Sequence, residues 1–272
     1  MDIKHKAKRL LLTSPLGKSA KDIQSAIQML KIHVKSKPSN PQPTVYSLSP
    51  YKTGTTFLSQ SFSPHSSSHE PLHNFTLRKL SLRKYSQNNF DTFFSIRNRY
   101  LNLKLECSGF WSAFVLELAS CEYSRDLNYI FILRKPSAWV TSVFNFWNRP
   151  YYQSLHYEFV NELFWKQKVG VDLLNINLQD PLEVESAAST LLKFYFRVTR
   201  ESQILKNVLY IKLENLESKI ESVGELLAEK PSTRGSSKRQ AKTKPFHYSN
   251  KEVDQEYARL VESLSGNNLN HS

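Results

Sequence analysis

Cysteine, glycine and long apolar runs are all scarce in this chain of 272 residues, and each scarcity excludes a class of protein. The only cysteines, Cys107 and Cys121, lie in apolar surroundings, so we expect reduced buried thiols rather than a disulfide or a metal pair. Seven glycines and many aromatic residues argue against a fibrous or disordered chain. No apolar run reaches the roughly eighteen residues of a membrane helix, and the amino terminus lacks the apolar core of a signal peptide. We therefore expect no membrane span and a cytoplasmic protein.

The net charge of +13 is concentrated in two segments. Residues 1–40 hold nine Lys and Arg against two Asp, and residues 230–244 hold six Lys and Arg with no acid, which leaves a body near neutrality. A solvated basic helix is the simplest interpretation of the first segment; attachment to nucleic acid or a membrane is the alternative. We expect no nucleic-acid partner.

Apolar strand patterns alternate with helical patterns, which predicts an α/β fold: one domain, with a central parallel sheet flanked by helices in three layers. Strands are expected at 44–49, 101–106, 128–133 and 208–212. Helices are expected from residue 55 or 56, and at 110–119, 136–147, 184–199 and 217–229. Residues 61–71, rich in Ser, His and Pro, are expected to form a loop. A basic arm and Pro-rich linker (1–43) would precede the domain (44–265), and a short tail (266–272) would follow it.

The segment 45–58 predicts an anion site, because a buried strand leads through a polar turn into a helix. Backbone N–H groups at a helix start, and in the turn before it, favour a phosphate or sulfate. Gly54 permits close approach of the backbone, and Lys52 adds a full positive charge. The hydroxyls of Thr55 and Thr56 can hold phosphate oxygens, and Thr53 completes the turn. The pattern indicates a phosphorylated or sulfated nucleotide as ligand.

The turn is not a Walker A loop, because its lysine precedes the only glycine of the segment and no glycine lies four or five residues upstream. The order Lys-Thr-Gly-Thr-Thr after a strand instead resembles the 5′-phosphosulfate loop of sulfotransferases. That resemblance implies 3′-phosphoadenosine 5′-phosphosulfate (PAPS) as cosubstrate and 3′-phosphoadenosine 5′-phosphate (PAP) as product. It also implies a sulfotransferase-like fold, related to that of P-loop NTPases, and no required metal.

A second motif follows the strand at 128–133, where Arg134-Lys135-Pro136 precedes a helix. An arginine fork at a strand end and a serine hydroxyl eight residues later, Ser142, can converge on one phosphate. This resembles the 3′-phosphate motif of the same family. A surface arginine and a serine bonded to its own helix are the structural alternative.

Two later segments resemble the family more weakly. Residues 208–216 resemble a late strand whose tyrosine stacks near the adenine, but Leu213 stands in the place of that tyrosine. Arg234, Gly235 and Ser236 resemble the loop that closes over the 3′-phosphate, with a helix expected behind it from about residue 250. The basic residues of 230–244 would then steer a polyanionic donor.

The catalytic base is the open point of this interpretation. Lys104-Leu105-Glu106 occupies the position where cytosolic sulfotransferases carry Lys-x-His, so Glu106 is the first candidate, and Lys52 is expected to meet the charge on the leaving phosphate. A strand-end carboxylate paired with a cation is the structural alternative for Glu106. One of His65, His69 and His73 is the rival base, and their spacing of four also raises the weaker possibility of a metal site.

The favoured hypothesis is sulfonate transfer from PAPS to a hydroxyl or amine of a small molecule, such as a natural product. Transfer to a carbohydrate, and a non-enzymatic protein that binds nucleotide or nucleic acid through the basic arm, are the alternatives. The acceptor, the choice between O- and N-sulfonation and the oligomeric state stay open at this point.

Overall fold

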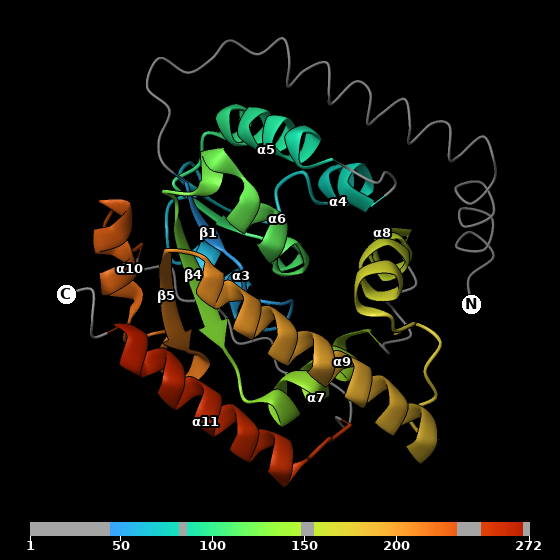
Figure 1. The fold of residues 1–272 in the computed structure, drawn as a ribbon. Coiled ribbons are helices and arrows are strands. Elements are labelled where there is room, and N and C mark those ends of the chain that lie inside the picture. The colour runs from blue at the N-terminus through green and yellow to red at the C-terminus, as the bar shows by residue number, and fades with distance from the viewer. Residues whose placement is uncertain (1–43, 82–85, 148–154, 233–245, 269–272) are drawn as a thin grey trace, which may run out of the picture.

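The computed structural model describes residues 44–81, 86–147, 155–232 and 246–268. Within these ranges the chain is an α/β domain built on a five-stranded sheet of order β2-β3-β1-β4-β5 (Figure 1). Every strand pair in the sheet is parallel. The strands are β1 (Val45–Ser47), β2 (Ser67–His69), β3 (Leu105–Cys107), β4 (Asn128–Leu133) and β5 (Asn207–Lys212). The predicted fold class, a central parallel sheet flanked by helices, is confirmed.

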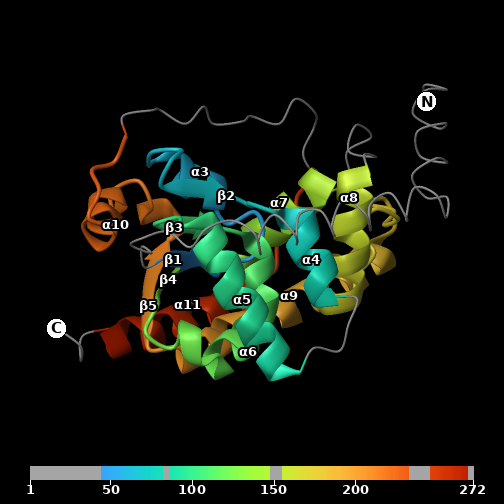
Figure 2. The same cartoon turned by 90° about the horizontal axis from the view of Figure 1, so that it is seen from above.

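Helices cover both faces of the sheet (Figure 2). The α-helices are α3 (Thr55–Gln60), α4 (His73–Ser81), α5 (Gln87–Leu101), α6 (Val115–Ser120), α7 (Pro136–Trp147), α8 (Leu155–Val160), α9 (Pro181–Glu201), α10 (Ile220–Leu227) and α11 (Lys251–Asn268). A 3₁₀ turn at Gly109–Phe114 precedes α6, and a π-helix at Asn161–Val169 follows α8. In Figure 2, α3 and α10 lie on one side of the sheet, while α5, α6, α9 and α11 lie on the other.

The two faces bury two separate apolar cores because side chains alternate along a strand. On β4, Tyr129, Phe131 and Leu133 join the larger core, which contains most of the aromatic residues. Ile130 and Ile132 point to the opposite face and join the smaller core with residues of α3 and α10. A strand buried on both faces reads as a continuous apolar run, which is why 128–133 was identifiable from sequence.

Strand β1 lies in the middle of the sheet, between β3 and β4. The chain leaves β1 toward β2 and β3 on one side and only later crosses to β4 and β5 on the other. In open α/β sheets the crevice at such a switch point, at the carboxyl ends of the strands, is where ligands bind. The loop after β1 therefore occupies the position where the fold favours a site.

Two predicted elements have the predicted bounds, 128–133 for β4 and 136–147 for α7. The expectation of a loop at 61–71 was wrong, because Ser67–His69 forms the edge strand β2. The helix expected at 110–119 is divided into a 3₁₀ turn and α6, and α4 and α5 were not predicted.

Both cysteines are free and buried, as expected. No helix in the described ranges is both long enough and apolar enough to cross a bilayer. The predicted basic arm at 1–43 lies outside the described residues. Helix α11 extends to Asn268, past the predicted domain end at residue 265.

Candidate functional site

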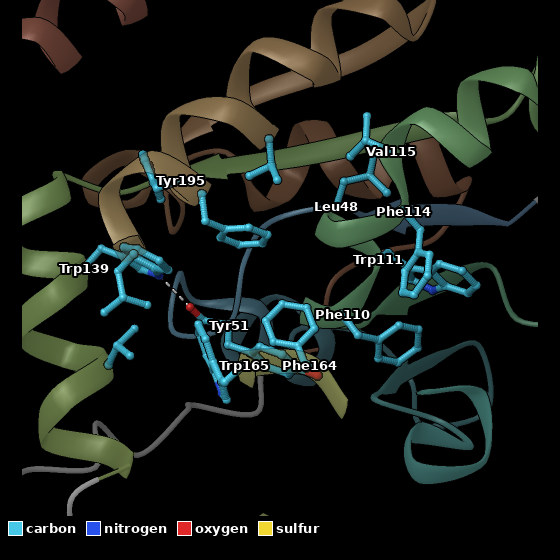
Figure 3. Close-up of a cluster of buried hydrophobic side chains, with 14 of the residues drawn as sticks. Leu48, Tyr51, Phe110, Trp111, Phe114, Val115, Trp139, Phe164, Trp165 and Tyr195 are labelled. Carbon is cyan, nitrogen blue, oxygen red and sulfur yellow. Dashed lines mark hydrogen bonds between the residues drawn. The ribbon is translucent and has the colours of Figure 1, made fainter. Parts of the chain in front are cut away.

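Hydrogen bonds attach the loop after β1 to the neighbouring strand and helix. The hydroxyl of Ser49 accepts a hydrogen bond from Ile132 N (2.6 Å), and Thr53 Oγ1 donates to Pro50 O (2.7 Å). The indole N–H of Trp139, on α7, donates to Tyr51 O (2.7 Å; Figure 3). These hydrogen bonds hold the loop in one shape, and a preorganised loop lowers the entropic cost of binding an anion.

Two loop residues adopt left-handed backbone conformations, Lys52 (φ 70°) and Gly54 (φ 105°). Gly54 caps α3, and it also meets the segment after β5. A Cβ at Gly54 would lie 2.7 Å from Leu213 Cδ1 and 3.2 Å from Leu216 Cδ2. Leu213 therefore packs against the predicted phosphate loop.

The structure brings the two predicted anion-binding segments together. Arg134 Nη1 donates to the carbonyl oxygen of Lys52 over 2.6 Å, so the strand-end arginine lies directly beside the loop. Tyr195, buried on α9, fixes Arg134 from behind: its hydroxyl accepts from Arg134 N (2.9 Å) and donates to Arg134 O (2.7 Å). Burial lowers the pKa of Arg134, but a guanidinium stays protonated at neutral pH.

Ser142 lies on α7 and is half-buried. Its predicted partnership with Arg134 on one phosphate stays a prediction. The amino-terminal end of α7 is occupied by α11, since Asp254 accepts a hydrogen bond from Ser137 N (3.1 Å) and pairs with Lys135 (3.3 Å). Arg234, Gly235 and Ser236 lie outside the described residues.

The hydroxyls of Thr55 and Thr56 meet a histidine from the neighbouring edge strand. His69 Nε2 shares hydrogen bonds with Thr55 Oγ1 (3.3 Å) and Thr56 Oγ1 (3.1 Å). Burial, and then the charge of Lys52, lower the pKa of His69 from 6.5 to about 4. His69 is therefore neutral near pH 7 and can exchange hydrogen bonds with these hydroxyls without adding charge.

Glu70, directly after β2, is a site residue that sequence reasoning missed. Burial raises the pKa of its carboxyl from 4.5 to about 7, while the charge of Lys52 lowers it. Its two oxygens face two histidines: Oε1 lies 3.9 Å from His69 Nε2, and Oε2 lies 3.3 Å from His73 Nδ1. His73 Nε2 in turn is hydrogen-bonded to the hydroxyl of Tyr51 (2.6 Å). A carboxyl that titrates near neutrality at a strand end is suited to proton transfer.

Glu106 has a different environment, which speaks against its predicted role as base. Its side chain is fully buried and pairs with Arg97, with Oε2 2.5 Å from Nη1 and Oε1 2.9 Å from Nη2. Oε1 also accepts from Ser108 Oγ (2.8 Å) and Trp111 Nε1 (2.7 Å). Internal donors thus surround both oxygens, whereas a general base must face the proton that it removes. This is the structural alternative weighed from sequence.

The three histidines of the predicted rival are not equivalent. His69 and His73 lie beside Glu70, whereas His65 is exposed before the edge strand. In the described part of the chain, no group of three or more His, Cys, Asp or Glu is arranged to hold a metal ion.

This chain resembles solved structures, but it matches no family model and no curated protein. Among solved structures, a sulfotransferase from Alicyclobacillus acidocaldarius aligns over 83% of this chain and 95% of its own, with 14% identity and a TM-score of 0.44. Similarity at this level defines neither the family nor the activity of the chain.

Gly54 and Gly170, which both have a left-handed backbone, allow a matched test of the loop. Both positions have a positive φ, which costs an alanine about 1–2 kcal/mol, so each Gly→Ala change should destabilise the protein. Gly54→Ala should destabilise it more than Gly170→Ala. Only Gly54 adds a close contact: its new Cβ would meet Leu213 at 2.7 Å, while that of Gly170 would meet Thr190 at 3.7 Å. Urea denaturation measures both free energies of unfolding. Equal losses would show that the side chain of Leu213, or the loop itself, moves aside without a cost in stability.

Proposed function

We propose that the protein is a PAPS-dependent sulfotransferase that moves a sulfonate group to a hydroxyl or amine of a small molecule. The observation that carries this proposal is the 2.6 Å hydrogen bond from Arg134 to the carbonyl of Lys52, which joins the two predicted anion-binding segments at one edge of the sheet. A nucleotide with a phosphate at both its 3′ and its 5′ position could place one phosphate at each of these two segments.

The loop after β1 would hold the 5′-phosphosulfate. Lys52 supplies the charge, the N–H groups of residues 53–56 supply donors, and the hydroxyls of Thr55 and Thr56 can turn from His69 to the ligand. Arg134, with Ser142 and the segment containing Arg234, Gly235 and Ser236, would hold the 3′-phosphate. Leu213, in the segment after β5, packs closely against Gly54 of the loop. The segment after β5 would therefore border the nucleotide.

The reaction would be an in-line displacement at sulfur. The acceptor oxygen or nitrogen forms a bond to sulfur, the bond from sulfur to the 5′-phosphate oxygen breaks, and PAP leaves with that electron pair. The acceptor proton passes to a carboxylate, and we assign this role to Glu70 in place of Glu106. Lys52, whose charge acts on Glu70 and His69, would meet the negative charge that develops on the leaving oxygen. No step of this scheme requires a metal.

The surroundings of Lys52 support an acceptor with an apolar body. Its ammonium lies 3.9 Å from the ring centroid of Phe146, which is a cation–π contact. Tyr51, the preceding residue, packs against Phe164 and Trp165 (Figure 3). Those three side chains are buried core, whereas Phe146 is half-buried and offers an aromatic face beside the ammonium, which suits a phenol or alcohol better than a long acidic glycan.

Binding of PAP tests the two cationic segments. Lys52→Ala and Arg134→Ala should each weaken PAP about tenfold or more, since a lost charge-assisted hydrogen bond is worth about 1.5–3 kcal/mol. Isothermal titration calorimetry measures the Kd. Lys206→Ala is the control, because Lys206 is a surface cation at the opposite, amino-terminal end of β5. Unchanged affinity in both site variants would reject the proposal.

Glu70→Gln tests the base through two readouts. Release of PAP from PAPS should fall about 100-fold, and the wild-type decline in rate below about pH 7 should disappear, because the group that titrates is gone. Exposed Glu217→Gln is the control. A wild-type pH profile in Glu70→Gln would return the role to a histidine or to Glu106.

The same variant should also be more stable than the wild type at alkaline pH. The folded pKa of Glu70 is raised, so the wild type loses stability as pH rises from about 4.5 to about 7, while an uncharged glutamine does not. We expect Glu70→Gln to gain up to about 3 kcal/mol at pH 8 and nothing at pH 4. Urea denaturation at the two pH values measures the difference, and an equal effect at both would contradict the buried carboxyl.

A further inference from the structure

An ion pair with no exposed surface lies behind the proposed base. Arg97, on α5, and Glu106, the middle residue of β3, both have fully buried side chains and meet through two parallel hydrogen bonds. The loss of hydration can exceed the attraction within such a pair, so apolar residues of similar size often serve stability equally well. Stability alone therefore does not explain why this ion pair is present, and its other contacts indicate a second role.

The remaining donors of Arg97 show what the pair holds. Nη2 donates to the carbonyl oxygen of Pro71 (2.7 Å), and Nε donates to Thr76 Oγ1 on α4 (2.9 Å). Pro71 is the residue after Glu70, so the guanidinium grips the backbone of the turn that carries the proposed base.

That turn has an unfavourable backbone. Glu70 (φ 54°) and Leu72 (φ 52°) are both left-handed although neither is glycine, and Pro71 lies between them. Residues in this region keep such a conformation only where their surroundings impose it. The surroundings here are the hydrogen bond from Arg97 to Pro71 and one from Glu70 N to Cys107 O (3.1 Å) at the end of β3.

Glu106 orients the guanidinium that makes this contact. Ser108 and Trp111 donate to the same carboxylate, and Arg97 lies against the ring of Trp111, with 5.3 Å from Cζ to the centroid. The carboxylate is thus fixed by its own neighbours and fixes Arg97 in turn. A lysine could not do the same, because a single ammonium lacks the planar fork that reaches Glu106 and Pro71 together.

We propose that Arg97 and Glu106 are positioning residues that hold the left-handed turn at Glu70–Leu72, and with it the Glu70 carboxylate, in its reactive place. This rests on the proposed function, since it assigns Glu70 the role of base. The pair carries no net charge, so it orients the turn without adding a charge of either sign. The groups that act electrostatically on Glu70 are Lys52, His69, His73 and the hydroxyl of Tyr51.

The test replaces the whole pair by apolar residues of similar size, Arg97→Met with Glu106→Leu. Removal of both charges avoids the uncompensated buried charge that either single change would leave. We expect a folded protein that binds PAP as the wild type does, because Lys52 and Arg134 are untouched. Hydrolysis of PAPS, with water as acceptor, should fall about tenfold or more.

A second readout does not depend on activity. Carbon-13 NMR titration of the side-chain carboxyls, with the Glu70 signal assigned by its loss in Glu70→Gln, reports the pKa of Glu70 directly. In the double variant this pKa should move from about 7 toward 4.5, as the turn relaxes and water reaches the carboxylate. Thr76→Val is the matched control, because it removes another hydrogen bond of Arg97 but leaves the one to Pro71 in place.

The outcomes separate this proposal from the one on which it rests. A wild type that neither binds PAP nor hydrolyses PAPS rejects the sulfotransferase. A wild type that does both, beside a folded double variant with unchanged rate and unchanged Glu70 pKa, rejects the positioning role alone. If the double variant does not fold, Arg97→Lys gives the same test: it keeps the charge and loses the fork, so wild-type rate and pKa in that variant overturn the proposal.

Discussion

The contact between the Arg134 guanidinium and the Lys52 carbonyl is the interaction on which the site depends. It joins the loop after β1 to the end of β4, two strands that are neighbours in space but more than eighty residues apart in sequence. Tyr195 then fixes the backbone of Arg134 from α9, and Trp139 fixes Tyr51 from α7. The backbone of Lys52 and the guanidinium of Arg134 are thereby kept together at the carboxyl-terminal edge of the sheet, where open α/β folds bind their ligands.

Burial shifts the pKa values of two titratable residues beside this loop, His69 and Glu70. The edge strand β2 brings His69 and Glu70 against the same loop, and loss of hydration moves the pKa of the histidine down and that of the glutamate up. Both shifts favour the neutral form, so near pH 7 the histidine is uncharged and the glutamate titrates. The charge of Lys52 opposes the shift of Glu70, so a bound polyanion that neutralises Lys52 would raise the affinity of Glu70 for a proton.

Strands β1 and β4 and the residues at their ends were predictable from sequence, because both strands are buried on two faces and read as apolar runs. The rule that parallel strands place their carboxyl ends at one edge then brings Lys52 and Arg134 together without a structure. β2 was not predictable, because it is a polar strand of three residues at the sheet edge, with prolines at 64 and 71 nearby. Its stability comes from pairing with β3, which no local pattern reveals. Because β2 was not predicted, Glu70 was not recognised as a residue at a strand end.

The two glutamates show why residue type at a strand end is insufficient to identify a base. Glu70 directly follows β2, and Glu106 is the middle residue of the adjacent parallel strand β3, where it pairs in register with Ser68. What separates them is the third partner: Arg97, from a helix that was not predicted, reaches Glu106 with two donors and Glu70 with none. The carboxylate that receives the guanidinium is enclosed by internal donors and becomes part of the scaffold. Glu70 is buried and faces two histidines, so its carboxyl can change its charge near neutral pH. That property is what proton transfer requires.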